Sequence, residues 1–159
     1  MKLNSIGLNA NKSKELSNEL NGLLANFQQY YQNLRGIHWN IKGKRFFDLH
    51  VKFEELYNDA NMKVDEIAER ILTLGGMPLH TFEDYMEKTQ VPVGKNITKD
   101  VEAIRLIVDS LTQLLIIERS ILNASGDAED EGTNSMMSDF ITQQEKTVWM
   151  MKAWLVEEI

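Results

Sequence analysis

Five side chains between residues 38 and 69 have the types and spacing expected of a site for a first-row metal ion. They are two imidazoles and three carboxylates: His38, His50, Glu54, Asp65 and Glu69. Mixed nitrogen and oxygen ligands suit iron, manganese or zinc, suit calcium less well, and are wrong for soft copper(I). The chain has no cysteine, which excludes thiolate ligands and disulfide bonds. Such a set can bind Fe(II) and stabilise Fe(III).

Four of these residues share one face of a helix predicted over residues 46–74. His50 and Glu54 are four positions apart, as are Asp65 and Glu69, and the eleven positions from Glu54 to Asp65 make about three helical turns. This face is turned by roughly 110° from the apolar stripe of the same helix, which includes Tyr57. It is therefore not the face that packs into the core of the chain.

One chain cannot place both pairs around one metal ion. At about 1.5 Å rise per residue, the pair at 50 and 54 lies about 22 Å along the axis from the pair at 65 and 69. Two such helices packed antiparallel about a two-fold axis bring the first pair of one subunit against the second pair of the other, twice per dimer. His38, facing inward on the preceding helix, would complete the site. The absence of a Glu-x-x-His motif, typical of di-iron sites within one bundle, also favours an interface.

Each of these residues also has an ordinary structural interpretation. An inward histidine such as His38 is commonly a hydrogen-bonded core residue, and His50, near a helix start, suits a surface position. Acidic residues four apart, such as Asp65 and Glu69, commonly form a solvated helix face. The hypothesis of a metal site rests on their shared phase and on a spacing compatible with two-fold symmetry.

Four long amphipathic segments are available to position these residues. Apolar residues recur three or four positions apart over residues 13–39, 46–74, 98–125 and 133–157. In the first segment the stripe consists of Leu16, Leu20, Leu23, Phe27, Tyr31 and Leu34. Four positions further along the same stripe is His38, so we expect this histidine to face inward.

The two halves of the chain are joined by a long connection over residues 77–96. It contains both prolines and a short helix predicted at 81–88. Gly75 and Gly76 are expected to end the second helix, and Thr98 is expected to cap the third. The sequence thus predicts an all-α four-helix bundle of the ferritin-like type, with one long crossover between its second and third helices.

Composition indicates one ordinary globular domain over residues 1–159, with a short N-terminal tail at 1–12. Apolar residues make up 43% and charged residues 26% of the chain. No segment resembles a signal peptide or a membrane span, so we expect a cytoplasmic location and no membrane partner. The formal net charge of −7 predicts weak attraction to nucleic acid, and it either concentrates cations or only confers solubility.

Several motifs spread over nearly the whole chain form one specific pattern. They are Gly36-Ile37-His38-Trp39-Asn40-Ile41-Lys42-Gly43, Phe46-Phe47-Asp48-Leu49-His50, Phe53-Glu54-Glu55-Leu56-Tyr57, Asp65-Glu66-Ile67-Ala68-Glu69-Arg70, Leu74-Gly75-Gly76, Asp130-Glu131-Gly132-Thr133 and Glu145-Lys146-Thr147-Val148-Trp149-Met150. Together they resemble the Dps family of mini-ferritins, whose name means DNA-binding protein from starved cells.

The resemblance implies a hollow dodecamer with tetrahedral symmetry and ferroxidase sites at its dimer interfaces. By motif position, His38, His50 and Glu54 would come from one subunit, and Asp65 and Glu69 from its partner. Position 54 is often Asp in this family, so Glu54 keeps an oxygen ligand on a longer stem. Members oxidise Fe(II) at mono-iron or di-iron sites, typically with hydrogen peroxide, and store ferric mineral, which removes both reactants of Fenton chemistry.

The resemblance also suggests four auxiliary residues. Trp39, beside His38, would quench oxidising equivalents or pack in an interface. Glu55 would help to nucleate mineral or would belong to a solvated helix face. Asp130 and Asp139 resemble positions near the three-fold pore through which iron enters, although an acidic turn before a helix is also ordinary N-terminal capping.

DNA binding is expected to be weak, because family members that bind DNA well often carry a lysine-rich tail. The first fourteen residues contain only Lys2, Lys12 and Lys14, and the C-terminal residues 156–159 are acidic. Multivalency in a twelve-subunit shell adds some affinity. Two other functions remain open: a non-enzymatic nucleoid protein that coats DNA, and a helical interaction module without metal. His80, in the crossover, has no assigned role.

Overall fold

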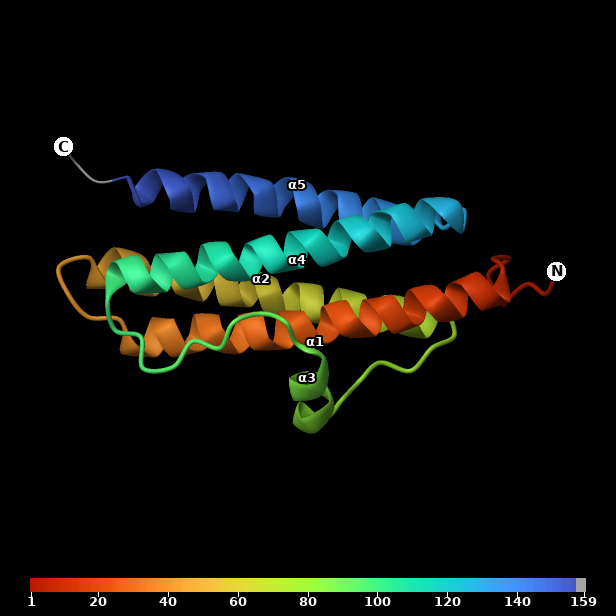
Figure 1. Ribbon diagram of the computed structural model, residues 1–159, viewed down its shortest axis with the longest axis horizontal. Helices are drawn as coiled ribbons and strands as arrows, with labels where there is room; N and C mark the ends of the chain where they lie inside the picture. The colour runs from red at the N-terminus through yellow and green to blue at the C-terminus, as the bar shows by residue number, and fades with distance from the viewer. Residues whose placement is uncertain (157–159) are drawn as a thin grey trace.

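The computed structural model describes residues 1–156 of the chain. This part contains four long helices and one short helix, joined by loops. The long helices are α1 (Ala10–Asn40), α2 (Phe46–Thr73), α4 (Asp100–Asp127) and α5 (Glu131–Trp154), and the short one is α3 (Phe82–Lys88). Figure 1 shows the four long helices along a common axis, with α3 in the crossover. The predicted all-α bundle is confirmed.

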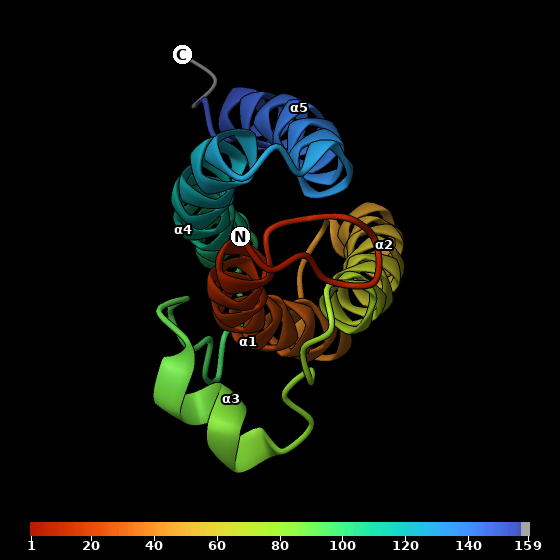
Figure 2. The same ribbon diagram turned by 90° about the vertical axis from the view of Figure 1, so that its right-hand side faces the viewer.

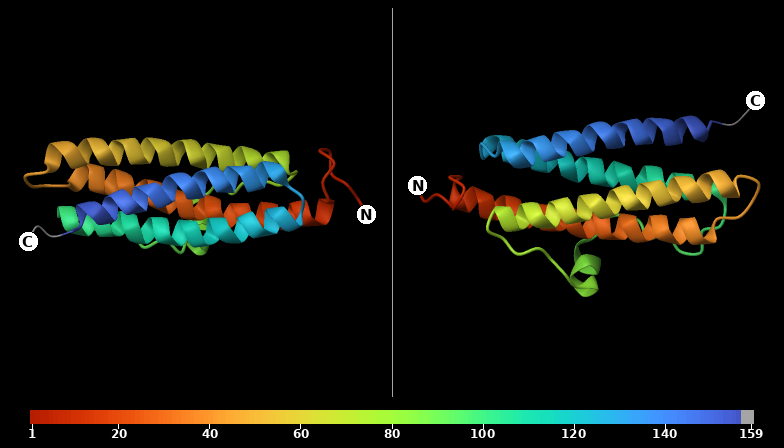
Figure 3. Two further views of the ribbon diagram at one scale, coloured as in Figure 1. Left: turned by 90° about the horizontal axis from the view of Figure 1, so that it is seen from above. Right: turned by 180° about the vertical axis from the view of Figure 1, so that it is seen from behind.

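The crossover returns the chain along the length of the bundle, so that α2 and α4 run in the same direction (Figures 1 and 3). Seen end-on in Figure 2, the four long helices surround one core, and α3 lies outside it next to α1. Within residues 1–156, no helix is both long and apolar enough to cross a membrane.

Apolar side chains from all four long helices fill the core. Among those almost fully removed from solvent are Leu20, Phe27, Phe53, Ile67, Ile104 and Met137. Each stabilises the fold by about 1.5–3 kcal/mol relative to an exposed position. The predicted inward position of Tyr31 holds only in part: Tyr31 is half-buried against the core and Tyr57 of α2, whereas its neighbour Tyr30 is buried. The buried residues Phe27, Tyr30, Leu34 and Ile37 follow the alternating steps of three and four residues of a heptad, and the predicted step of four from Phe27 to Tyr31 departs from that repeat.

Three of the long helices begin at other positions than expected. α1 begins at Ala10, since the Asn9 side chain accepts from two backbone N–H groups. Thr98 does not cap α4; its carbonyl accepts from the Lys42 N–H, and Lys99 precedes the helix. α5 begins at Glu131, capped by Asp130, and ends at Trp154. The predicted end at position 157 lies outside the described residues.

Asparagines on α1 fasten the crossover to the bundle. The Asn26 Oδ1 atom accepts from the backbone N–H groups of Gln90 and Val91, at 2.7 and 3.1 Å. Asn33 donates to the Pro92 carbonyl and accepts from the Gly94 N–H. Both asparagines are buried, so these bonds satisfy their polar side chains as well as backbone groups of the crossover. The part of the crossover that follows α3 is therefore held to α1 without forming a regular element.

The N-terminal residues fold back on the start of α1. Leu3 and Asn9 form an isolated antiparallel bridge, and the Asn4 side chain accepts from the N–H groups of Ile6 and Leu8. Gly7 has a φ of 81°, which a side chain would strain. The segment 1–12, predicted as a tail, is thus a closed loop followed by the first turn of α1.

Candidate metal centre

His38 at the end of α1 and His50 in the first turns of α2 hold each other in place. The Nδ1 atom of His38 donates to the His50 carbonyl at 2.7 Å, and Nδ1 of His50 donates to the His38 carbonyl at 2.8 Å. A carbonyl oxygen only accepts, so each Nδ1 carries a proton, and in the neutral ring each Nε2 keeps its lone pair. Both rings therefore present the nitrogen that a metal ion needs, in a fixed tautomer.

Aromatic contacts fix the planes of these two imidazoles. The rings of His38 and His50 stack with centroids 3.8 Å apart, and Phe46 stacks on His50 at 4.9 Å. The rings of Tyr57 and His38 pack edge-to-face, with centroids 5.3 Å apart. His38 is only 7% exposed, whereas His50 is half-buried. The pair is a rigid donor group at the junction of α1 and α2.

Glu54 lies one helical turn beyond His50 and is held by Tyr57. The Tyr57 hydroxyl donates to Glu54 Oε1 at 3.2 Å. Desolvation raises the pKa of Tyr57, and the adjacent Glu54 carboxylate raises it further. The phenol therefore stays protonated and able to donate at neutral pH. The sequence pattern places Tyr57 in the apolar stripe, although its position three residues after Glu54 is the spacing at which helical side chains meet.

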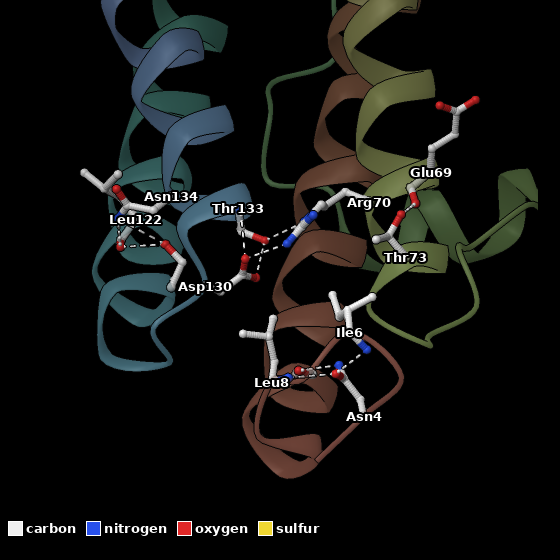
Figure 4. Close-up of polar contacts among 12 residues, drawn as sticks. Asn4, Ile6, Leu8, Glu69, Arg70, Thr73, Leu122, Asp130, Thr133 and Asn134 are labelled. Carbon is white, nitrogen blue, oxygen red and sulfur yellow. Dashed lines mark hydrogen bonds and ion pairs between the residues drawn. The ribbon is translucent and has the colours of Figure 1, made fainter.

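Asp65 and Glu69 are exposed on α2, apart from the histidine pair. Figure 4 shows the Glu69 side chain directed away from α5, whereas the next residue, Arg70, points toward Asp130. Within residues 1–156, no group of three or more His, Asp or Glu side chains converges to hold a metal ion. The chain thus unites His38 with His50 and leaves the two distal carboxylates on an open surface.

The auxiliary residues Trp39 and Glu55 are also exposed. Trp39 is 56% exposed, and the guanidinium of Arg35 lies 4.8 Å from its ring centroid. Arg35 also lies 5.3 Å from the ring of Tyr31 and so joins the two aromatic side chains. Glu55 forms a surface ion pair with Lys52 at 3.3 Å. These contacts are compatible with both interpretations offered for each residue.

Asp130 and Asp139 have different environments. Asp139 is exposed on α5, whereas Asp130 is 1% exposed and caps that helix by accepting from the Thr133 N–H. Asp130 also accepts from Arg70 Nη2 at 2.5 Å and from the Thr133 hydroxyl, as Figure 4 shows. The capping interpretation therefore holds for Asp130, whose oxygen atoms are already engaged. Arg70 thereby links α2 to α5, and nothing in the sequence pattern predicts this contact.

A second polar cluster lies inside the bundle. Gln144 of α5 donates to both carboxylate oxygens of Glu118 at 2.7 and 2.5 Å, and Glu118 is fully buried. Burial raises the pKa of Glu118 to about 8, although Gln144 and the positive charge of Lys63 oppose the shift. Lys63 is itself buried, with its ammonium bonded to Asp59 and Gln143. Burial in this cluster thus favours the neutral form of the Glu118 carboxyl.

Comparison with known proteins agrees with this architecture. A family model described as a ferritin-like domain matches residues 17–158. A protein of Porphyromonas gingivalis named DNA protection during starvation protein is 41% identical, with 85% of each chain covered. The crystal structure of a Dps protein from Vibrio cholerae O1, described as a member of a broad superfamily of ferritin-like diiron-carboxylate proteins, is 48% identical. It superposes with a TM-score of 0.96 over 98% of each chain.

A Dps variant from Listeria innocua, in which two histidines twelve positions apart are replaced by glycine, is 27% identical. Its TM-score is 0.85, with 88% of this chain and 93% of that chain covered. The match of the family model over most of the chain, together with the relatives above, establishes the family. The chain belongs to the Dps proteins of the ferritin-like family.

Proposed function

We propose that two copies of this chain form a two-fold dimer whose interface contains two ferroxidase sites. His38, His50 and Glu54 of one subunit and Asp65 and Glu69 of the other bind Fe(II) as the substrate. Twelve subunits then enclose a cavity that stores the ferric product, in the cytoplasm. The observation that carries this proposal is the exposed face of α2, on which ligands and apolar residues are arranged symmetrically about one point.

The symmetry of this face is apparent from its pairing in an antiparallel dimer. If Glu54 lies opposite Asp65, then His50 lies opposite Glu69, and Asn58 lies opposite Asn61. The same register sets Phe47, which is 81% exposed, opposite Leu72, which is 59% exposed. One register thus pairs every proposed ligand of α2 with a ligand and an exposed apolar residue with another. An isologous interface requires this self-complementarity.

The donor set suits iron chemistry. Two neutral imidazoles and three carboxylates bind Fe(II), and the carboxylates stabilise the additional charge of Fe(III). Two Fe(II) ions supply the two electrons that reduce one hydrogen peroxide molecule to two hydroxide ions. The fixed Nδ1–H tautomer of each histidine avoids a rearrangement when iron binds. The histidines replaced in the Listeria innocua variant have the same spacing as His38 and His50, which supports their importance.

Co-assembly of two inactive variants tests the shared site. His38→Ala and Asp65→Ala should each abolish rapid Fe(II) oxidation by limiting hydrogen peroxide under anaerobic conditions. When the two variants are expressed together, random pairing makes half of the dimers mixed, and each mixed dimer has one site with all its ligands. About a quarter of the native rate should return, as two-fold symmetry requires.

In the matched control, the single variants His38→Ala and His50→Ala are expressed together. Both changes affect the same half of the site, so no mixed dimer contains an intact site and activity should stay absent. Recovery in this control, or no recovery in the first mixture despite normal assembly, contradicts a site shared in this way. Slow oxidation at one rate in the native protein and all variants contradicts the ferroxidase function itself.

A further inference from the structure

We propose that Tyr57 is a positioning residue of the ferroxidase site, which orients the Glu54 carboxylate for iron and supports the His38 ring. This inference rests on the proposed function and adds a residue outside the predicted ligand set. Tyr57 contacts both proposed ligands at once: its hydroxyl donates to Glu54 Oε1 at 3.2 Å, and its ring packs edge-to-face with His38, with the two ring centroids 5.3 Å apart.

The contact gives Glu54 one preferred orientation. A glutamate on an exposed helix face has several rotatable bonds, and binding a metal ion must fix them. The Tyr57 hydroxyl engages Oε1, which leaves Oε2 and the remaining lone pair of Oε1 for iron. A hydrogen bond to a ligand carboxylate is the usual means by which the surroundings of a metal site set its geometry.

The tyrosine is itself held from two sides. Its ring meets Tyr31 of α1 edge-on at 6.0 Å and His38 at 5.3 Å. Because Tyr57 packs on two rings of α1 and bonds to Glu54, it fixes the position of this proposed ligand of α2 relative to α1. The length of Glu54 is part of the same arrangement, because the shorter aspartate would withdraw its carboxylate from the hydroxyl.

Cobalt(II) binding and Fe(II) oxidation together test the role. Tyr57→Phe retains the ring and removes only the hydroxyl. It should weaken Co(II) binding about tenfold, alter the visible spectrum of the bound Co(II), and raise KM for Fe(II) more than it lowers kcat. Tyr31→Phe is the matched control, because the Tyr31 hydroxyl makes no hydrogen bond within residues 1–156, and it should bind Co(II) as the native protein does.

Glu54→Asp provides a second route that leaves Tyr57 intact. It should weaken Co(II) binding by a similar factor, and adding Tyr57→Phe should have no further effect, since the bond is already lost. Unchanged Co(II) affinity in Tyr57→Phe, or fully additive effects in the double variant, overturns the positioning role. If the native protein neither binds Co(II) nor oxidises Fe(II), the proposed function fails as well, and that result differs from a failure confined to Tyr57.

Discussion

Hydrogen bonds at single residues decide which groups in this bundle are chemically available. The two imidazoles are locked by each other's carbonyls, so their free nitrogens point away from the bonds that hold the rings. Glu118 shows the opposite case, because its carboxyl is enclosed in the core and bonded to Gln144. Burial favours the neutral acid there, whereas Glu54 on the surface is accessible to a cation.

The raised pKa of Glu118 predicts a specific dependence of stability on pH. Its pKa rises from 4.5 in the unfolded chain to about 8 in the fold, so the folded state binds the proton more tightly. The tighter binding of this proton contributes up to about 5 kcal/mol to the free energy of unfolding. The contribution is fully present below about pH 4.5 and is lost as the pH rises to about 8. Urea unfolding at several pH values measures it.

Glu118→Gln isolates this effect. The amide cannot ionise, so the decline in unfolding free energy over this pH window should be reduced in the variant. Glu102→Gln, on the exposed side of the same helix, is the control and should retain the native pH profile. The prediction is wrong if Glu118→Gln and the native protein decline in parallel.

At the scale of the elements, hydrogen bonds and ion pairs join segments of the bundle in addition to the apolar packing of the core. The crossover is attached through Asn26 and Asn33, and the C-terminal half of α2 is joined to the start of α5 through Arg70 and Asp130. Gly132 leaves room for this contact, since a Cβ atom there would lie 2.7 Å from the Arg70 guanidinium nitrogens. These links hold α2 in the orientation that exposes its proposed ligand face.

Two ion pairs between an arginine and a carboxylate should differ in their effect on the free energy of unfolding. In the Arg70–Asp130 pair the side chains are 16% and 1% exposed, and Arg70→Met leaves a buried carboxylate without its cation. We expect a loss of about 3 kcal/mol in the free energy of unfolding. The Arg119–Glu145 pair is 48% and 54% exposed, so Arg119→Met should cost less than about 1 kcal/mol. Equal losses in urea titrations would falsify this assignment.

At the scale of the whole molecule, the net negative charge opposes binding to DNA. Each chain has a formal charge of −7, which repeated subunits multiply. Of the three N-terminal lysines, Lys12 already donates to the Asp127 carbonyl at 2.6 Å. The segment that contains Lys2 is folded back by the bridge between Leu3 and Asn9. Few cations at this terminus are therefore available to replace the counterions of DNA.

DNA binding should accordingly be weak at physiological salt. A gel-shift titration at neutral pH is expected to show no retardation at roughly 150 mM salt, and at most slight retardation at low salt, as counterion release predicts. Strong retardation that persists at physiological salt would instead favour the nucleoid protein that coats DNA. Addition of several lysines at the N-terminus is the positive control, since it should produce salt-dependent retardation.

The sequence by itself determined the number of long helices, the crossover and the shared helical phase of the proposed ligands on α2. These features depend on periodicity and on nearby residues, as do the exposed positions of Glu54, Asp65 and Glu69. Only the tertiary structure decided the reciprocal bonds of His38 and His50, the contact of Tyr57 with Glu54, and the attachment of Arg70 to Asp130. Each joins side chains whose distance depends on how helices pack or which rotamers they adopt, and a single-residue shift, as at Tyr31, lies beyond what spacing alone resolves.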